Sequence, residues 1–213
     1  MTITARALEH FYGHEQVLRG VDIDISPGTF VAIVGESGSG KTTLLSILST
    51  LLQPTSGNVV YDGKALSEWG NIDTFRRSHI GFVFQFHYLI SYLTLRENIA
   101  LAALSDVENE IDPLMRRLGI EQLGSRYSDS VSGGERQRAA IARALINRPS
   151  IVFADEPTGN LDTKNALGVY ELFAEFSRQN TTFVVASHDK KITEFADTII
   201  EMEDGLVKNI TVR

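Results

Sequence analysis

Short apolar runs recur along the chain and define its predicted architecture. Five runs are apolar at nearly every position: 30–35, 80–84, 150–154, 181–187 and 197–202. Runs of this kind indicate strands buried on both faces, as in a parallel sheet covered by helices. Residues 163–178 instead place apolar side chains at helical spacing, directly after Asp162, a residue type that caps helices. Alternating strands and helices predict an α/β fold with a mainly parallel sheet.

The first thirty residues follow a different pattern. Apolar and polar residues alternate over 21–25, as in a strand with one buried face. Residues typical of turns stand at Gly13, Gly20 and Pro27-Gly28. This stretch is therefore expected to form antiparallel strands beside the main sheet.

Helical patterns replace strand patterns between residues 86 and 148. They run over 95–104 and 106–120, and Pro149 is expected to end the last helix of the segment. We expect residues 86–148 to form a helical lobe inserted into the α/β core.

The chain is thus predicted to be one domain, 1–213. Segments 1–85 and 149–213 would form the α/β core with its antiparallel part, and a chain of 213 residues is long enough to bury a sizeable core.

Charge and composition narrow the possible partners. The 27 acidic residues outnumber the 20 basic ones, and the net charge of -7 argues against a dedicated nucleic-acid binder. Without cysteine the chain has no disulfide and no thiolate metal site. No apolar run approaches the roughly 18 residues that span a bilayer, and the first residues lack the apolar region of a signal peptide. We expect a cytoplasmic protein, with any membrane role supplied by a partner.

A phosphate-binding pattern follows the first buried run. Residues 35–42 read GESGSGKT and match G-x-x-x-x-G-K-[ST] between a predicted strand and a predicted helix. Lys41 is expected to reach the β- and γ-phosphates of a nucleotide, and the Thr42 hydroxyl to ligate Mg²⁺. The alternative, a glycine-rich turn without a ligand, does not explain the complete motif in this context. The expected nucleotide contacts are consecutive: Gly35, Glu36, Ser37, Gly38, Ser39, Gly40, Lys41, Thr42 and Thr43.

Two carboxylates end a later buried run. Asp155 and Glu156 follow the strand at 150–154. Open α/β sheets bind ligands at the carboxyl ends of their strands, so both acids are expected near the phosphates. Asp155 would then support Mg²⁺, and Glu156 would orient or deprotonate a water molecule. Taken alone, the same pair would indicate a solvated turn.

The stretch VSGGERQRAAIARAL at 131–145 raises a question of its own. Ser132 and Glu135 form the pattern of a capping box at a helix start. Gly133 and Gly134 lie between them, although each glycine costs about 0.5–1 kcal/mol relative to alanine within a helix. Capping alone does not explain two adjacent glycines.

These motifs, in this order, resemble those of ATP-binding cassette (ABC) ATPases. The resemblance covers nearly the whole chain and rests on GESGSGKTT, Gln85 after IGFVF, VSGGERQR, IVFADEP, NLD at 160–162 and Ser187-His188. The run EPTGNLD looks more narrowly like the bacterial subgroup that drives lipoprotein release, macrolide export and cell-division complexes.

The resemblance gives the two glycines a role. In ABC ATPases this helix start contacts the ATP held by the other subunit, which implies a homodimer in the ATP-bound state. Gly133 and Gly134 would leave amides open to the γ-phosphate, and Ser132 would add a hydroxyl donor.

Four further positions take their roles from the family. Tyr12 would stack on adenine, although neighbouring Phe11 is an alternative and plain packing another. Gln85 would complete the Mg²⁺ shell and sense the membrane subunit, and His188 would contact the γ-phosphate. Asp162 would belong to the subunit-interface loop, although helix capping alone would explain it.

The resemblance implies an ATP-hydrolysing subunit of a membrane transport or mechanical-transmission complex. An integral membrane permease would dock near residues 86–100, where Ser91 stands in place of the subgroup's usual proline. The alternatives are a soluble ABC ATPase associated with DNA or ribosomes, and a nucleotide-binding scaffold with negligible turnover. The net negative charge argues against association with DNA or ribosomes, and the intact Glu156 argues against a scaffold without turnover.

Overall fold

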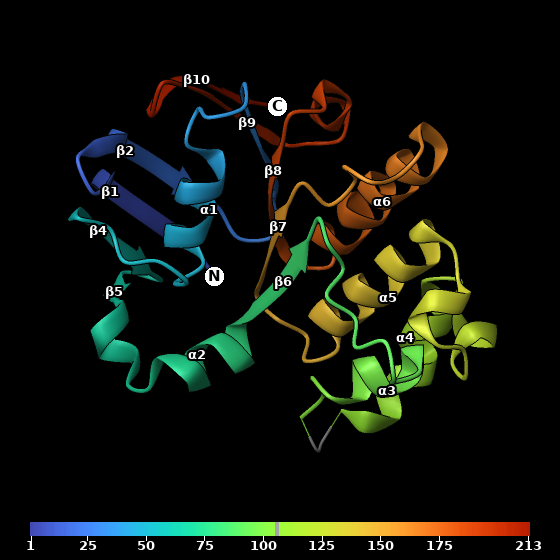
Figure 1. Ribbon diagram of the computed structural model, residues 1–213. Helices are drawn as coiled ribbons and strands as arrows, with labels where there is room; N and C mark the ends of the chain where they lie inside the picture. The colour runs from blue at the N-terminus through green and yellow to red at the C-terminus, as the bar shows by residue number, and fades with distance from the viewer. Residues whose placement is uncertain (105–106) are drawn as a thin grey trace.

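The strands form two sheets in the computed structural model, which describes residues 1–104 and 107–213 (Figure 1). The larger sheet has the order β10-β9-β3-β8-β7-β6 and is parallel except where β10 pairs with β9. Its strands are β3 (Phe30–Val34), β6 (Ile80–Phe84), β7 (Ile151–Asp155), β8 (Thr182–Ser187), β9 (Thr198–Glu203) and β10 (Leu206–Val212). The five runs predicted as buried strands are β3 and β6 to β9, with ends within two residues.

Burial on both faces of this sheet is confirmed by β3. Phe30, Ala32 and Val34 belong to one apolar core, together with residues of the helices on that face. Val31 and Ile33 belong to a second core on the opposite face. Every residue of β3 is buried, which explains why its sequence is apolar throughout.

The smaller sheet is antiparallel and has the order β2-β1-β4-β5. Its strands are β1 (Ile3–Tyr12), β2 (Glu15–Ile25), β4 (Ser56–Tyr61) and β5 (Lys64–Ala65). The predicted antiparallel strands in the first thirty residues are thus confirmed, and Gly13 lies in the turn between them. The turn predicted at Gly20 is wrong, because this glycine lies inside β2 with a φ of 89°.

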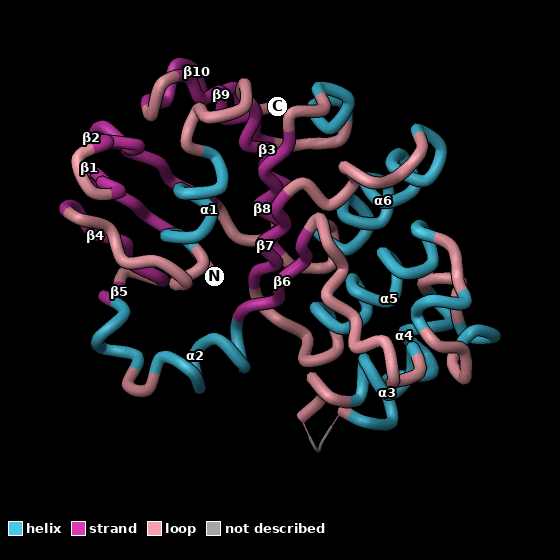
Figure 2. The backbone as a smooth tube through the Cα atoms, viewed as in Figure 1, coloured by secondary structure: helices cyan, strands magenta, loops and turns pink. Residues whose placement is uncertain are grey.

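The helices lie on both sides of the larger sheet. They are α1 (Lys41–Leu48), α2 (Ile72–His79), α3 (Leu95–Ala100), α4 (Ile111–Arg117), α5 (Gly133–Leu145) and α6 (Thr163–Ser177). Figure 2 shows α3 to α6 gathered on one side and α1 on the other, beside β1 and β2. The buried side of α1 shares a core with residues of both sheets. This packing holds the phosphate loop, which leads into α1, between the two sheets.

The segment predicted as a helical lobe contains α3, α4 and α5. In the described part of this segment there is an isolated β-bridge between Thr94 and Tyr127 but no strand. The helix predicted over 95–104 ends at Ala100, and the pattern at 106–120 begins outside the described residues and yields α4. None of the helices described is long and apolar enough to cross a bilayer.

Candidate functional site

The phosphate loop joins β3 to α1, and two of its glycines have clear structural reasons. A Cβ at Gly35 would lie 2.2 Å from the carbonyl oxygen of Met202 on β9, so no larger residue fits there. Gly40 is the N-cap of α1 and has a φ of 97°, a conformation that favours glycine. Among the described residues no side chain caps α1, and its first turn holds no acidic residue. This helix start therefore has no side-chain acceptor that competes with a phosphate.

The Lys41 ammonium group is folded back over the loop. Its Nζ donates to the carbonyl oxygens of Gly35 (2.9 Å) and Glu36 (2.7 Å) and lies 3.5 Å from the hydroxyl of Ser39. Burial lowers the pKa of Lys41, and the charges of Glu156 and Asp155 partly oppose this shift. A bound phosphate would compete with the two carbonyls for this cation.

Thr42 and Asp155 meet although 113 positions separate them. The Thr42 hydroxyl donates to Asp155 Oδ1 at 3.1 Å. Burial raises the pKa of Asp155, and the hydrogen bond from Thr42 opposes this rise. Both side chains carry oxygen atoms, the ligands that Mg²⁺ prefers. Among the described residues, no cluster of three or more His, Cys, Asp or Glu side chains could hold a metal by itself. The pair therefore fits a Mg²⁺ that keeps waters and phosphate oxygens as its other ligands.

Glu156 is held in place by the end of β8. Its φ is +45°, an uncommon conformation for a residue with a side chain, and its amide donates to the carbonyl of Ala186 (2.9 Å). The carboxylate accepts from the Ser187 hydroxyl (3.2 Å) and from the His188 amide (2.9 Å). His188 Nδ1 lies 2.8 Å from the same carboxylate. The structure thus brings together Glu156, the expected base, and His188, the residue expected to contact the γ-phosphate.

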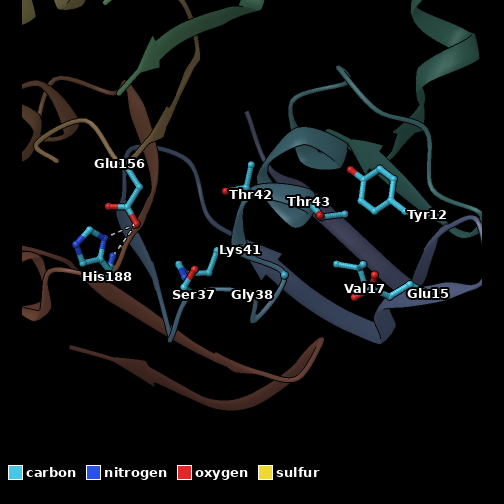
Figure 3. A pocket seen from close by; sticks show the side chains of 11 residues that line it. Tyr12, Glu15, Val17, Ser37, Gly38, Lys41, Thr42, Thr43, Glu156 and His188 are labelled. Atoms are coloured by element: carbon cyan, nitrogen blue, oxygen red, sulfur yellow. Dashed lines mark hydrogen bonds and ion pairs between the residues drawn. The ribbon is translucent and has the colours of Figure 1, made fainter. Parts of the chain in front are cut away.

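Lys41, Thr42, Glu156 and His188 border a cleft of about 460 Å³, a size typical of small-molecule sites. Asp155 does not line it. Figure 3 shows Glu156 and His188 on one side, Tyr12 on the other, and Lys41 and Thr42 between them. The lining residues come from both sheets and from the phosphate loop: Tyr12, Glu15, Val17, Ser37, Gly38, Gly40, Lys41, Thr42, Thr43, Glu156 and His188. An elongated ligand with a flat ring at one end and anionic groups at the other suits this arrangement.

Tyr12 is the aromatic residue that the structure places in the cleft. Tyr12 is 55% exposed, and its ring meets the buried His10 ring edge-on, with 4.8 Å between ring centroids. Phe11, the alternative, is not part of the lining. The sequence interpretation missed Glu15 and Val17, which line the same end. Their signal was the tight hairpin at Gly13, because Tyr12 pairs directly with Glu15 across it.

Several predicted site residues lie outside this lining. Gln85 contacts the segment after Glu156: its carbonyl accepts from Asn160 Nδ2 (3.2 Å), and a Cβ at Gly159 would come within 2.7 Å of its amide nitrogen. Asp162 caps α6 by accepting from the Asn165 amide (2.9 Å), as its position predicted.

The start of α5 is also absent from the cleft. Ser132 is the N-cap of α5, and Glu135 completes the predicted capping box. The two glycines behind Ser132 differ. A Cβ at Gly134 would lie 2.9 Å from Asn165 Oδ1, so packing against α6 accounts for this glycine. A Cβ at Gly133 would find its nearest neighbour, Leu161, at 3.7 Å, so packing within one chain does not account for Gly133.

Comparison with known proteins now places the chain in a family. Residues 18–159, more than half of the chain, match the family described as ABC transporter. The chain belongs to this family. It is an ABC-type ATPase, the ATP-binding and ATP-hydrolysing subunit of such a transporter, and the expected family and fold class are confirmed.

Curated relatives of this ABC ATPase carry a narrower name. The lipoprotein-releasing system ATP-binding protein LolD of Cytophaga hutchinsonii is 43% identical over 205 residues, covering 92% of this chain and 94% of that protein. The protein of the same name from Bacteroides thetaiotaomicron is 40% identical over 206 residues, with the same coverage.

Solved structures agree with the ABC assignment. The ATP-binding cassette MJ0796, in a dimeric post-hydrolysis state bound to ADP and Pi, superposes with a TM-score of 0.88 at 33% identity and covers 99% of this chain and 98% of its own. The cbiO1 protein from Clostridium perfringens, part of the cbiONQ transporter complex, has a TM-score of 0.88 at 29% identity. That alignment covers 99% of this chain and 88% of the other.

Proposed function

We propose that two copies of this ABC ATPase close around two Mg²⁺-bound ATP molecules and drive a membrane complex for lipoprotein release. One observation carries the proposal. The cleft of a single chain brings together Lys41, Glu156 and His188, yet the start of α5, which the family resemblance assigns to the terminal phosphate, is not part of it. A second copy would supply that missing side.

Open space beside the phosphate loop supports a second copy. A hollow of about 1170 Å³ borders the other side of the loop and also includes His188. The structurally similar cassette MJ0796 is dimeric in two solved structures. We therefore place the partner's Ser132, Gly133 and Gly134 against the γ-phosphate of an ATP bound here.

The proposed hydrolytic roles follow from chemistry and placement. Glu156 would polarise the attacking water, with its carboxylate oriented by the end of β8. Lys41 and His188 would stabilise negative charge on the departing phosphoryl group. Thr42 and Asp155 would hold Mg²⁺, with Gln85 completing the shell; when bound, the ion neutralises phosphate charge.

The remaining positions would bind the rest of the nucleotide or the second copy. Tyr12 would stack on adenine, because an exposed aromatic face accepts a base without further burial. Asp162 would lie at the subunit interface while also capping α6. After hydrolysis the terminal phosphate no longer bridges the two copies, and the dimer would open.

A membrane partner would dock on the helical side of the molecule. Phe86, Tyr88 and Tyr92, within the predicted docking region 86–100, are 63%, 66% and 78% exposed. The Tyr88 carbonyl accepts from Arg143 (2.6 Å), which lines a groove of about 710 Å³. Among the described residues, the charged side chains of this groove are Arg76, Arg77 and Arg143. Large exposed aromatic residues near a groove are typical of interaction sites. Together with the LolD relatives, this surface supports an integral membrane permease and a peripheral location on the cytoplasmic face of the inner membrane.

Replacing the proposed base tests the dimer. Glu156→Gln should lower ATP hydrolysis by roughly 10²–10⁴-fold and leave ATP binding intact, because the amide cannot accept a proton. With Mg²⁺ and ATP the variant should elute as a dimer in size-exclusion chromatography, and without nucleotide as a monomer. A monomer under both conditions contradicts this sandwich, in which two chains enclose two ATP molecules.

Ser132→Arg separates the two halves of the site. This variant should bind ATP as the parent does, because Ser132 is outside the cleft of its own chain. It should fail to dimerise in the Glu156→Gln background and should hydrolyse ATP poorly. Normal turnover by Ser132→Arg would refute the proposal that the start of α5 acts on the nucleotide of the other subunit.

A further inference from the structure

Glu135 forms hydrogen bonds with Ser132, the N-cap of α5. The Ser132 hydroxyl donates to Glu135 Oε2 at 2.8 Å, and the Ser132 amide donates to the same oxygen at 2.7 Å. In return, the Glu135 amide donates to the Ser132 hydroxyl at 3.4 Å. Both the donor and the acceptor function of this hydroxyl are therefore used within one chain.

A hydroxyl has a single proton to donate. If Ser132 donates to the γ-phosphate of ATP held by the other copy, it must first release Glu135. The competition is between two anionic acceptors for one donor, and both would lie at the same helix start.

The negative charge of Glu135 is not neutralised nearby. In the described part of the chain no lysine, arginine or histidine forms an ion pair with it. The adjacent Arg136 instead donates to the carbonyls of Ser128 (3.2 Å) and Val131 (2.7 Å). The hydrogen bonds from the Ser132 amide and hydroxyl lower the pKa of Glu135, so the carboxylate stays ionised at neutral pH.

We propose that Glu135 is a positioning residue that restrains ATP-driven dimerisation: it holds the Ser132 hydroxyl away from the partner's nucleotide and repels the terminal phosphate. This inference rests on the proposed sandwich and adds a restraint to it. ATP closes the dimer only by displacing Glu135 from Ser132, so the closed state is less stable than the other contacts alone would make it.

The substitution Glu135→Gln tests the restraint because glutamine also forms capping boxes. In the Glu156→Gln background it should lower the ATP concentration for half-maximal dimer formation by about fivefold or more, as one like-charge repulsion is removed. In an otherwise unaltered chain it should lower KM for ATP without raising kcat, because tighter closure slows reopening.

The chain contains a matched control. Thr94 and Glu97 form the same capping box at the start of α3, with the hydroxyl and amide of Thr94 both 2.8 Å from Glu97 Oε2. Glu97 does not line the nucleotide cleft. Glu97→Gln, measured in the purified chain without a membrane partner, should change the melting temperature as much as Glu135→Gln does and leave the ATP dependence of dimerisation unchanged.

Salt provides a second measurement of the same repulsion. Raising sodium chloride from about 50 mM to about 300 mM screens repulsion between exposed charges. In the Glu156→Gln background, added salt should therefore shift dimer formation more favourably with glutamate at 135 than with glutamine. Equal ATP and salt dependence with glutamate or glutamine at 135 would overturn the restraint while leaving the sandwich intact. If the Glu156→Gln protein itself never dimerises, the proposed function fails.

Discussion

Two helix starts in this protein are proposed to contact phosphate, and they are built in opposite ways. The start of α1 follows Gly40, has no side-chain cap and has no acidic residue in its first turn. The start of α5 follows Ser132, is closed by a complete capping box and carries Glu135 in its first turn. Both helices direct a positive dipole end toward their starts. At the first start no side-chain cap competes with an anion, whereas at the second the Ser132 hydroxyl must leave Glu135 before it can donate to one.

In the proposed dimer, this difference would allow one chain to bind ATP before the dimer closes. The open start of α1 lies in the cleft, so a phosphate there would displace no side-chain cap. Lys41 would exchange the carbonyls of Gly35 and Glu36 for the phosphate. The start of α5 first has to give up hydrogen bonds of about 2.7–2.8 Å to Glu135. Closure would therefore depend on a strong anionic ligand, such as the γ-phosphate.

The largest expected effect comes from removing the cation at the open helix start. Lys41→Ala should weaken ATP binding by roughly 30-fold or more, because charge-assisted hydrogen bonds to phosphate are lost. Isothermal titration calorimetry with ATP measures this affinity. Lys64→Ala is a suitable control, since Lys64 lies over the Trp69 ring and does not line the cleft. Unchanged affinity in Lys41→Ala would exclude Lys41 from the phosphate site.

Smaller effects on stability and activity should distinguish Gly133 from Gly134 at the start of α5. Gly133→Ala fits without a close contact and should stabilise the isolated chain by about 0.5 kcal/mol, or roughly 1–2 °C in melting temperature. The same change should reduce ATPase activity by about tenfold if this backbone approaches the partner's phosphate.

Gly134→Ala should have the opposite effect on the melting temperature from Gly133→Ala. Its Cβ would meet Asn165, whose side-chain amide donates to Asp162 Oδ2 at 2.8 Å and is thus held in place. It should lower the melting temperature. A Gly133→Ala protein that is more stable and fully active would remove the functional reason for this glycine.

The smallest effect concerns the carboxylate beside the open helix start. Burial raises the pKa of Asp155, so the native protein binds this proton more readily than the unfolded chain, and its stability falls as pH rises through the native pKa. Asp155→Asn should therefore raise the melting temperature at pH 8 without nucleotide, by up to about 2 °C.

The gain in Asp155→Asn should shrink as the pH is lowered through the native pKa of Asp155, because the carboxyl group of the parent protein is then neutral. Differential scanning fluorimetry over this range, without Mg²⁺ and ATP, measures the change. A gain that grows toward low pH would show that burial does not destabilise the ionised form.

The central strands and two of the helix caps could be predicted from local sequence. The central strands were predictable because burial on both faces requires uninterrupted apolar residues, and the caps at Ser132 and Asp162 because their partners lie three positions along the chain. The elements that were missed lack such signals. Strand β10 is almost wholly exposed, and α2 buries only Phe75, so neither shows a clear apolar period.

The sequence predicted both carboxylates near the phosphate loop, but it could not decide which side chains meet there. Strand order, a property of the whole sheet, brings Glu156 to Ser187 and His188, and Asp155 to Thr42. The close approach of Met202 to Gly35, and of Asn165 to Gly134, likewise depends on how β9 and α6 pack. Periodicity and capping act over a few residues and are encoded there. Contacts across the sheet depend on the packing of all its elements at once, and only the tertiary structure defines them.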